Sequence, residues 1–150
     1  MTVKSTRYVG LLILFMGCML FFGGLVPAAA VAGEKVAAEK TVVYYFHGNR
    51  RCATCRGIEE NTRKVVDGDF GELVRRGRLE FRSVNLDQSE NEHFVKEFQL
   101  VSRTVVLARE AAGKTVDWKT LDKVWLLAHQ PDKFRAYIKS ELDGFLRSPK

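Results

Sequence analysis

The stretch VVYYFHGNRRCATC at residues 42–55 is the strongest indication of the fold, because it joins an apolar run to a pair of cysteines. The run VVYYF at 42–46 is continuous and rich in β-branched and aromatic residues, and the turn residues HGN at 47–49 follow it. A short run of this kind predicts a strand that is buried on both faces, as in the interior of a parallel sheet. Cys52 and Cys55 then stand where the chain is expected to enter its next helix.

The cysteine pair has the spacing and the setting of a redox-active dithiol. At a junction between a strand and a helix, unpaired backbone N–H groups and the positive end of the helix dipole favour a thiolate over a thiol. Arg50, Arg51 and Arg56 add positive charge nearby. Because the thiolate is the attacking species in disulfide exchange, we predict that Cys52 is the nucleophile. Cys55, one turn into the helix, is then expected to resolve the mixed disulfide.

A structural bridge and a metal site are the alternatives for this pair. A bridge from Cys52 to Cys55 would close a very short loop and would gain little chain entropy. Structural zinc sites need four ligands, and the sequence holds no second cysteine pair. A site built from the two cysteines and His47, which ends the predicted strand, stays open. Covalent haem attachment would need a histidine directly after the pair, where Arg56 stands.

The chain after the cysteines predicts a helix, a strand and a second helix. Apolar residues recur at helical spacing over 58–66, and the sequence DGD at 67–69 predicts the end of that helix. Residues 79–86 predict a second strand. The sequence SENE at 89–92 predicts a capping box, in which the serine bonds a backbone N–H and a glutamate reaches back. The helix that follows is expected to bury Phe94, Val95 and Phe98.

The last third of the chain predicts a strand, a hairpin and a closing helix. Residues 104–108 predict a third strand, and AAGK at 111–114 predicts a tight turn into a hairpin partner. A short helical stretch over 121–127 comes next, and Pro131 begins the final helix. That helix carries one apolar stripe, which is Phe134, Ile138, Leu142 and Phe145. Because the first three strands alternate with helices, we expect them to run parallel, with the hairpin as an antiparallel edge.

Residues 1–33 differ in composition from the rest and predict an export signal. Lys4 and Arg7 precede an uncharged run at 8–26, and small residues with Ala-x-Ala patterns follow. This is the order of a secretory signal peptide, but the run also approaches the ~20 residues that span a bilayer. A cleaved signal, an inner-membrane anchor and acylation at Cys18 therefore stay open. All three predict that residues 34–150 form one domain outside the cytoplasm, in the periplasm.

Composition limits the other classes of function. The hydrophobic content of 46% and the charged content of 28% are those of a globular domain, not of a disordered chain. The net charge of +6 comes from basic residues scattered among acids, so nucleic acid is not expected as a partner. No flavin or nicotinamide fingerprint is present, and no cofactor is expected. His93 and His129 are expected at the surface, and Trp118 and Trp125 are expected to be packing residues.

With these residues in view, the chain resembles the thioredoxin superfamily over about residues 41–146. The resemblance implies a thioredoxin-like three-layer α/β/α fold with a mixed central sheet, and it puts Cys52 at the nucleophile position and Cys55 at the resolving position. The sequences YFHGNRRCATC, GKTVDW and LDKVW are similar to a narrower group of small exported bacterial proteins, the ArsF-like or nitrophenyl compound nitroreductase subunit family. That similarity implies a redox enzyme or a protein disulfide as the partner.

The sequence departs from the thioredoxin pattern at two places. Where thioredoxins carry a cis-proline before the third strand, this chain has Ser102-Arg103-Thr104. A cis bond before a non-proline residue costs about 2.5–4 kcal/mol, so we expect a trans bond and an altered docking edge. Arg103 and Thr104 are the predicted substrate-binding residues, with the guanidinium either over the dithiol or in solvent. Thioredoxins also bury an acid in the strand before the cysteines, and the predicted strand at 42–46 has none. Glu59, Glu60 or a water would then have to act as the base for the dithiol.

These observations lead to one hypothesis and two alternatives. The hypothesis is an exported thiol–disulfide oxidoreductase or electron-relay subunit that works with a partner protein through Cys52 and Cys55. One alternative is a protein that handles metal through the two cysteines and His47. The other is a non-catalytic binding module that has kept the fold.

Overall fold

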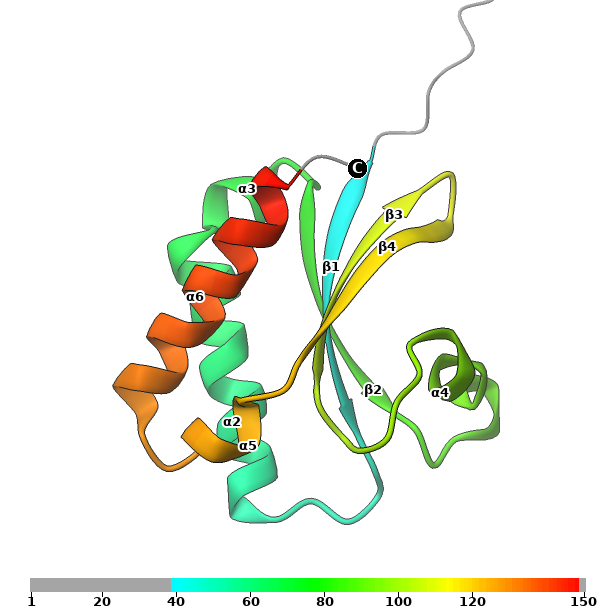
Figure 1. The fold of residues 1–150 in the computed structure, drawn as a ribbon, viewed down its shortest axis with the longest axis vertical. Helices are drawn as coiled ribbons and strands as arrows, with labels where there is room; N and C mark the ends of the chain where they lie inside the picture. The colour runs from blue at the N-terminus through cyan, green and yellow to red at the C-terminus, as the bar shows by residue number, and fades with distance from the viewer. Residues whose placement is uncertain (1–38, 149–150) are drawn as a thin grey trace, which may run out of the picture. The chain divides into compact units, whose positions relative to one another are not determined.

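Strand β1 (Lys40–His47) lies inside a four-stranded sheet in the computed structural model, which describes residues 39–148 (Figure 1). The strand order is β2-β1-β3-β4, with β2 at Leu79–Asn85, β3 at Val105–Ala111 and β4 at Lys114–Leu121. Strand β1 pairs with β2 in parallel and with β3 antiparallel, and β3 pairs with β4 antiparallel. The sheet is therefore mixed, as predicted.

The apolar run on β1 is buried because both faces of the sheet are covered. Val43 and Tyr45 point into the larger core. Their neighbours along the strand point into a smaller core on the opposite face, which also holds Phe98. Successive side chains of a strand alternate between faces, so a strand inside the sheet needs apolar residues at both parities. The predicted buried strand is confirmed.

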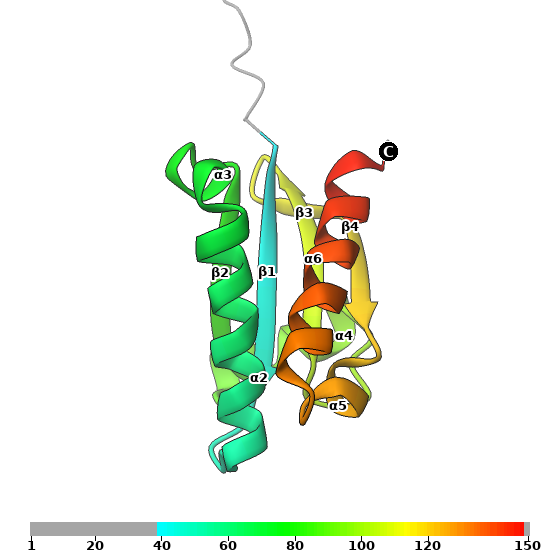
Figure 2. The ribbon, with the colours of Figure 1, turned by 90° about the vertical axis from the view of Figure 1, so that its left-hand side faces the viewer.

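Helices cover the two faces unequally. The face of the larger core carries α2 (Ala53–Lys64), the π-helical turn η1 (Val65–Asp69), α3 (Gly71–Arg75), α5 (Val124–Leu127) and α6 (Pro131–Arg147). Helices α2 and α6 lie side by side over the sheet (Figure 2). The other face carries the 3-10 turn η2 (Ser89–Asn91) and the short helix α4 (His93–Glu97). The result is a three-layer α/β/α arrangement of the thioredoxin type, which confirms the expected fold class.

The expectation that β3 runs parallel to the first two strands is wrong. The chain segment between β2 and β3 contains a helix, but α4 is only 5 residues long and spans ~8 Å. A parallel crossover would have to carry the chain back along a 7-residue strand, which is ~23 Å long. The chain instead starts β3 at the end of the sheet where β2 stopped, and β3 pairs with β1 antiparallel.

Two local predictions on the helices also need correction. The winding of the first helix ends at Asp69, within the predicted 67–69, but its regular α-helical part stops earlier, at Lys64, and the wider turn η1, in which Val65 and Val66 are both buried, fills the interval. The capping box does not form, because α4 begins four residues after Ser89, whose hydroxyl bonds the carboxylate of Glu90 instead. Phe98 is buried as expected, but Val95 is 39% exposed. The stripe on α6 is buried at all four predicted positions.

The predicted signal or anchor at residues 1–33 lies outside the described residues. Within residues 39–148, no helix is both long enough and apolar enough to cross a membrane. The choice between a cleaved signal and an anchor thus stays a prediction.

One end of the sheet collects the segments that matter for function. Strand β1 ends there at His47, β2 ends there at Asn85, and β3 starts there at Val105. The loops are fastened to one another by backbone hydrogen bonds, from Phe46 N to Thr104 O at 2.8 Å and from Leu86 N to His47 O at 2.8 Å. The cysteine pair follows β1 at this end.

Candidate dithiol site

Cys52 caps the N-terminus of α2. Its backbone is extended, with φ at −78° and ψ at 171°, and its sulfur accepts a hydrogen bond from the backbone N–H of Cys55 at 3.2 Å. The Sγ atoms of Cys52 and Cys55 are 2.7 Å apart. The sulfur of Cys52 thus takes the place that a capping oxygen takes in other helices, and it satisfies a backbone donor that the helix cannot satisfy itself.

The two thiols differ in exposure, and hydrogen bonds make the outer thiol, Cys52, more acidic. Cys52 is exposed, whereas Cys55 is buried at 8% exposure. The pKa of the Cys52 thiol is lowered, chiefly by the hydrogen bond with the Cys55 thiol and then by the backbone N–H of Cys55. These bonds stabilise the thiolate over the thiol. The site thus offers an outer sulfur that deprotonates readily and an inner sulfur in contact with it.

The arginines around the pair have different partners. Arg51 forms an ion pair with Glu59, whose side chain is only 17% exposed and which also lies 3.8 Å from Arg63. The Arg56 guanidinium donates to the carbonyl of Arg51 at 2.9 Å. The exposed Arg50 has no acidic partner within residues 39–148. Positive charge at the start of α2 is therefore only partly neutralised by the protein.

The candidate bases of the sequence analysis are both held by cations. Glu59 is engaged by Arg51 and Arg63. Glu60 is exposed and pairs with Lys64 at 2.6 Å, and the hydrogen bond from that lysine lowers the pKa of the Glu60 carboxyl. A carboxylate with a lowered pKa is a weaker base, so Glu60 is poorly suited to take a proton from Cys55.

Tyr45 supports the inner cysteine from beneath. Its buried hydroxyl donates a hydrogen bond to the backbone carbonyl of Cys55 at 2.8 Å. Burial raises the pKa of Tyr45 to about 12, so the hydroxyl keeps its proton and remains a donor. From the sequence, Tyr45 is expected only as a residue of a buried strand, because a local pattern does not show which group the hydroxyl of a buried tyrosine reaches.

His47 does not complete a metal site with the cysteines. Its ring stacks on that of Tyr45 with the centroids 5.9 Å apart, and its Nδ1 lies 3.0 Å from the carbonyl oxygen of Gly48. In the part of the chain that the structure describes, no three His, Cys, Asp or Glu side chains are grouped so that they could hold a metal ion. The alternative that combines Cys52, Cys55 and His47 thus finds no preformed ligand set.

Arg103 lies between the two positions considered for it, since its side chain is 46% exposed and yet lines a cavity beside Cys55. The bonds around it are trans, since residues 39–148 contain no cis peptide. Its guanidinium lies against Gly48, where a Cβ atom would overlap it, and it pairs with Asp87 at 3.5 Å. Asp87 also accepts the backbone N–H of Asn49 at 2.7 Å. Arg103 and Asp87 thus tie together the loops that follow β1, follow β2 and precede β3.

The second predicted binding residue, Thr104, lies beneath the surface. It is 5% exposed, and its hydroxyl donates to the backbone carbonyl of Leu121 at 3.1 Å. Its side chain is therefore committed to β4, and only its backbone carbonyl, which accepts Phe46 N, faces the neighbouring strand.

A cavity of about 520 Å³ opens beside Cys55. It is lined by Cys55, Leu86, Asp87, Val95, Leu100, Val101, Ser102, Arg103 and Trp125. Trp125 shapes one wall, because its indole N–H donates to the backbone carbonyl of Arg103 at 2.7 Å while its side chain stays 40% exposed. Trp125 was expected to be only a packing residue. Its spacing along α5 did not indicate that it lines a cavity beside Cys55.

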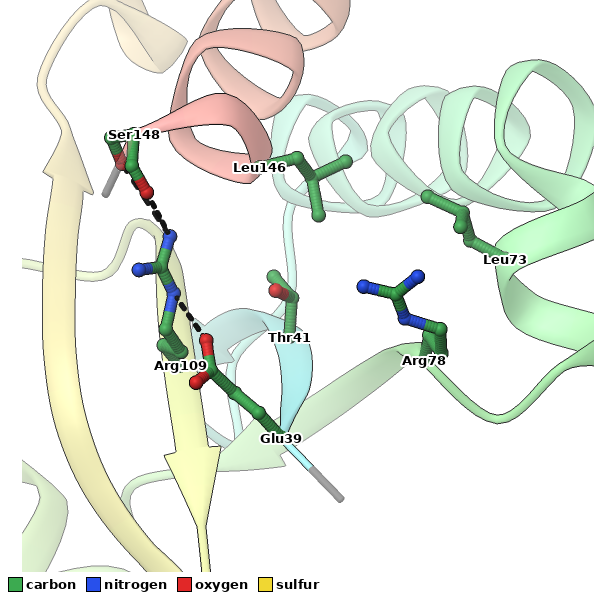
Figure 3. Close-up of a pocket in the computed structure, with 7 residues that line it drawn as sticks. All are labelled: Glu39, Thr41, Leu73, Arg78, Arg109, Leu146 and Ser148. Carbon is green, nitrogen blue, oxygen red and sulfur yellow. Dashed lines mark hydrogen bonds and ion pairs between the residues drawn. The ribbon is translucent and has the colours of Figure 1, made fainter. Parts of the chain in front are cut away.

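A second cavity lies at the opposite end of β1, between the start of that strand and the end of α6 (Figure 3). Arg109 is buried there, and its guanidinium pairs with Glu39 at 3.1 Å and donates to the carbonyls of Phe145 at 2.7 Å and Ser148 at 3.1 Å. These bonds fasten the last turn of α6 to β3. The residues that line this cavity include no cysteine or histidine.

Comparisons with known proteins give only distant likenesses. No protein-family model and no curated protein matches the chain. Among solved structures, a thioredoxin of Malassezia sympodialis is 21% identical, with 70% of this chain and 80% of that one covered at a TM-score of 0.42. A thioredoxin from Thermus thermophilus is 19% identical, with 72% and 75% covered at a TM-score of 0.43. Likenesses this distant say nothing of activity, which has to be inferred from the geometry of the dithiol.

Proposed function

We propose that this protein exchanges disulfides with a partner protein through Cys52 and Cys55. The observation that carries the proposal is the pair of sulfurs 2.7 Å apart at the start of α2, one exposed with a lowered pKa and the other buried behind it. An exposed thiolate can reach a sulfur on another protein, and a second thiol in contact with the first can displace the product.

The exchange proceeds in two balanced steps. The Cys52 thiolate attacks one sulfur of the partner disulfide, the partner S–S bond breaks, and the other partner sulfur leaves as a thiolate that takes up a proton. The Cys55 thiol then loses its proton and attacks the Cys52 sulfur, which releases the second partner sulfur as a thiol. Two electrons have passed to the partner, and Cys52 and Cys55 share a disulfide. The same steps run in reverse oxidise a partner dithiol.

The residues around the pair have separate roles in this scheme. The backbone N–H of Cys55 stabilises the attacking thiolate on Cys52. Tyr45 holds the carbonyl of Cys55 and so keeps the inner sulfur in place. Because Glu59 and Glu60 are occupied by cations, we assign the removal of the Cys55 proton to water.

The test is to trap the mixed disulfide in the full chain. A Cys55→Ser variant lacks the resolving thiol, so it should accumulate covalent adducts with partner proteins that a reductant releases. The matched control, Cys52→Ser, should form none, because the buried sulfur cannot reach a partner. Equal adducts from both variants, or none from Cys55→Ser, would contradict the assignment of roles.

We also propose that the domain works outside the cytoplasm, with a redox enzyme or a disulfide-bonded protein as its partner. The composition of residues 1–33 supports export, and the resemblance to the nitroreductase subunit group favours an enzyme partner. Cell fractionation and the mass of the purified chain test this location. A full-length chain in the cytoplasm would oppose it, and a full-length chain in the membrane fraction would favour the anchor over cleavage.

A further inference from the structure

The exposed apolar side chains of this protein gather beside the dithiol. Within residues 39–148, five large hydrophobic side chains are exposed, namely Val95 at 39%, Val101 at 101%, Val116 at 47%, Trp125 at 40% and Leu126 at 73%. Three of them, Val95, Val101 and Trp125, line the cavity next to Cys55, and Leu126 directly follows Trp125. A cluster of exposed apolar residues around a cavity marks a surface that another molecule covers.

The charges on the same surface are mainly positive. Arg103 lines the cavity, and its side chain is 46% exposed while it pairs with Asp87 at 3.5 Å. Arg50 and Arg56 are exposed near Cys52 and have no acidic partner in the described part of the chain. A long, solvent-exposed ion pair such as that of Arg103 is worth little, so a carboxylate from another molecule can replace Asp87 at small cost.

From these two features we infer that the partner presents an apolar side chain beside its reacting cysteine and acidic residues next to that side chain. The inference depends on the proposed disulfide exchange, and it adds the chemistry by which the partner is selected. The apolar side chain enters the cavity between Val101 and Trp125. The carboxylates pair with Arg103, which exchanges Asp87 for the partner, and with Arg50.

Both contacts act before sulfur chemistry begins. Burial of an apolar side chain stabilises the encounter in proportion to the area removed from water. The arginines attract an acidic segment and discriminate against a basic one, since like charges repel at close range. An Arg guanidinium suits this role because it offers paired donors to a carboxylate.

Peptide probes test the inference directly. Each probe is a short peptide whose single cysteine carries thionitrobenzoate as a mixed disulfide. Attack by Cys52 on the peptide sulfur releases coloured thionitrobenzoate, and Cys55 then releases the peptide as a thiol while the protein disulfide forms. The first probe has a leucine beside the cysteine and aspartates next to that leucine. The second probe replaces the aspartates by lysines. The third probe replaces the leucine by glycine. The neutral 2-hydroxyethyl disulfide serves as a reference substrate.

We expect the reduced full chain to prefer the leucine–aspartate probe over the glycine–aspartate probe by about tenfold in rate. We expect a preference over the leucine–lysine probe of about threefold to tenfold, falling as salt rises. Val101→Ser should weaken the first preference, whereas the control Val116→Ser, an exposed valine on β4, should not. Arg103→Gln should weaken the second and Arg103→Lys should restore part of it, whereas the control Arg147→Gln at the end of α6 should not.

Each comparison uses the ratio of two probes within one variant, so a change in the thiolate population cancels. Equal rates for all three probes, with normal reaction of 2-hydroxyethyl disulfide, would overturn this inference and leave the proposed function standing. Equal loss of preference in the control variants would overturn it too. No reaction with any disulfide would reject the proposed function and the inference together.

Discussion

Two arginines at the two ends of one strand show how differently this protein uses its ends. Arg109, within β3, is 4% exposed and is held by Glu39 and by the carbonyls of Phe145 and Ser148. Arg103, just before β3, has a side chain that is 46% exposed and a single acidic partner at 3.5 Å. Arg109 fastens the end of α6 to β3. Arg103 lies on a surface that also carries exposed apolar groups and the Cys55 thiol.

We infer from this difference that the end with weakly held groups is the one at which the proposed partner binds. A buried charged group whose hydrogen-bond donors are all paired within the protein has no donor left for a partner, and its removal lowers the free energy of unfolding. Charges and apolar groups that are only loosely engaged contribute little to stability and are free to bind. Stability and reactivity are thus separated along the length of the sheet.

The largest expected effect is on stability, at the Arg109 end. Arg109→Met removes the donor to two backbone carbonyls and the partner of a carboxylate, and we expect it to lower the free energy of unfolding by about 2–4 kcal/mol. Arg103→Met, the same change at the other end, should cost less than about 1 kcal/mol. Denaturant unfolding of both variants measures the two losses of free energy. Equal losses would contradict the expected difference between the two ends of the sheet.

The second effect is on reactivity and depends on pH. Because hydrogen bonds lower the pKa of the Cys52 thiol, its alkylation rate should level off at a pH below the ordinary cysteine value of about 8.5. Cys55→Ala removes the largest of these bonds, so the pKa of Cys52 should rise and the rate at neutral pH should fall. Alkylation of the Cys52 peptide followed by mass spectrometry measures both curves. Superimposable curves would show that Cys55 does not acidify Cys52.

The smallest effect sharpens the role of Arg103. Gly48→Ala places a Cβ atom where the Arg103 guanidinium lies, so the arginine must leave Asp87. The displaced group is the end of a flexible, exposed side chain, and we expect a loss of stability of only a few tenths of a kcal/mol. Unfolding midpoints of Gly48→Ala and of the unchanged protein measure this loss. A loss above about 1 kcal/mol would mean that the pair with Asp87 is structural.

Much of the fold could be predicted because its signals are local. The run at 42–46 is predicted by its composition and the stripe on α6 by its periodicity, and both are buried as expected. The predicted direction of β3 was wrong, because a strand's direction depends on how it pairs with β1, which lies far from it in sequence. The capping box at Ser89 failed for a related reason, since the helix start shifted to His93.

The candidate site was predictable in its sulfurs and not in its surroundings. A Cys-x-x-Cys pair between a strand and a helix is a local pattern, and the structure does bring both sulfurs to the start of α2. Tyr45 and Trp125 bond the carbonyls of Cys55 and Arg103 across separations of 10 and 22 residues along the chain. The residues that flank Tyr45 and Trp125 in the sequence do not indicate either contact.

Residues that are neighbours along the chain predict the strand that leads to the dithiol, the helix that follows it and the apolar faces of both, because composition, periodicity and spacing are local properties. The direction of β3, and the burial of Arg109 with Glu39 while Arg103 stays exposed beside Asp87, become visible only in the folded molecule. Those choices depend on distances between segments far apart in sequence, and two arginines six positions apart carry the same chemistry until the fold surrounds one of them.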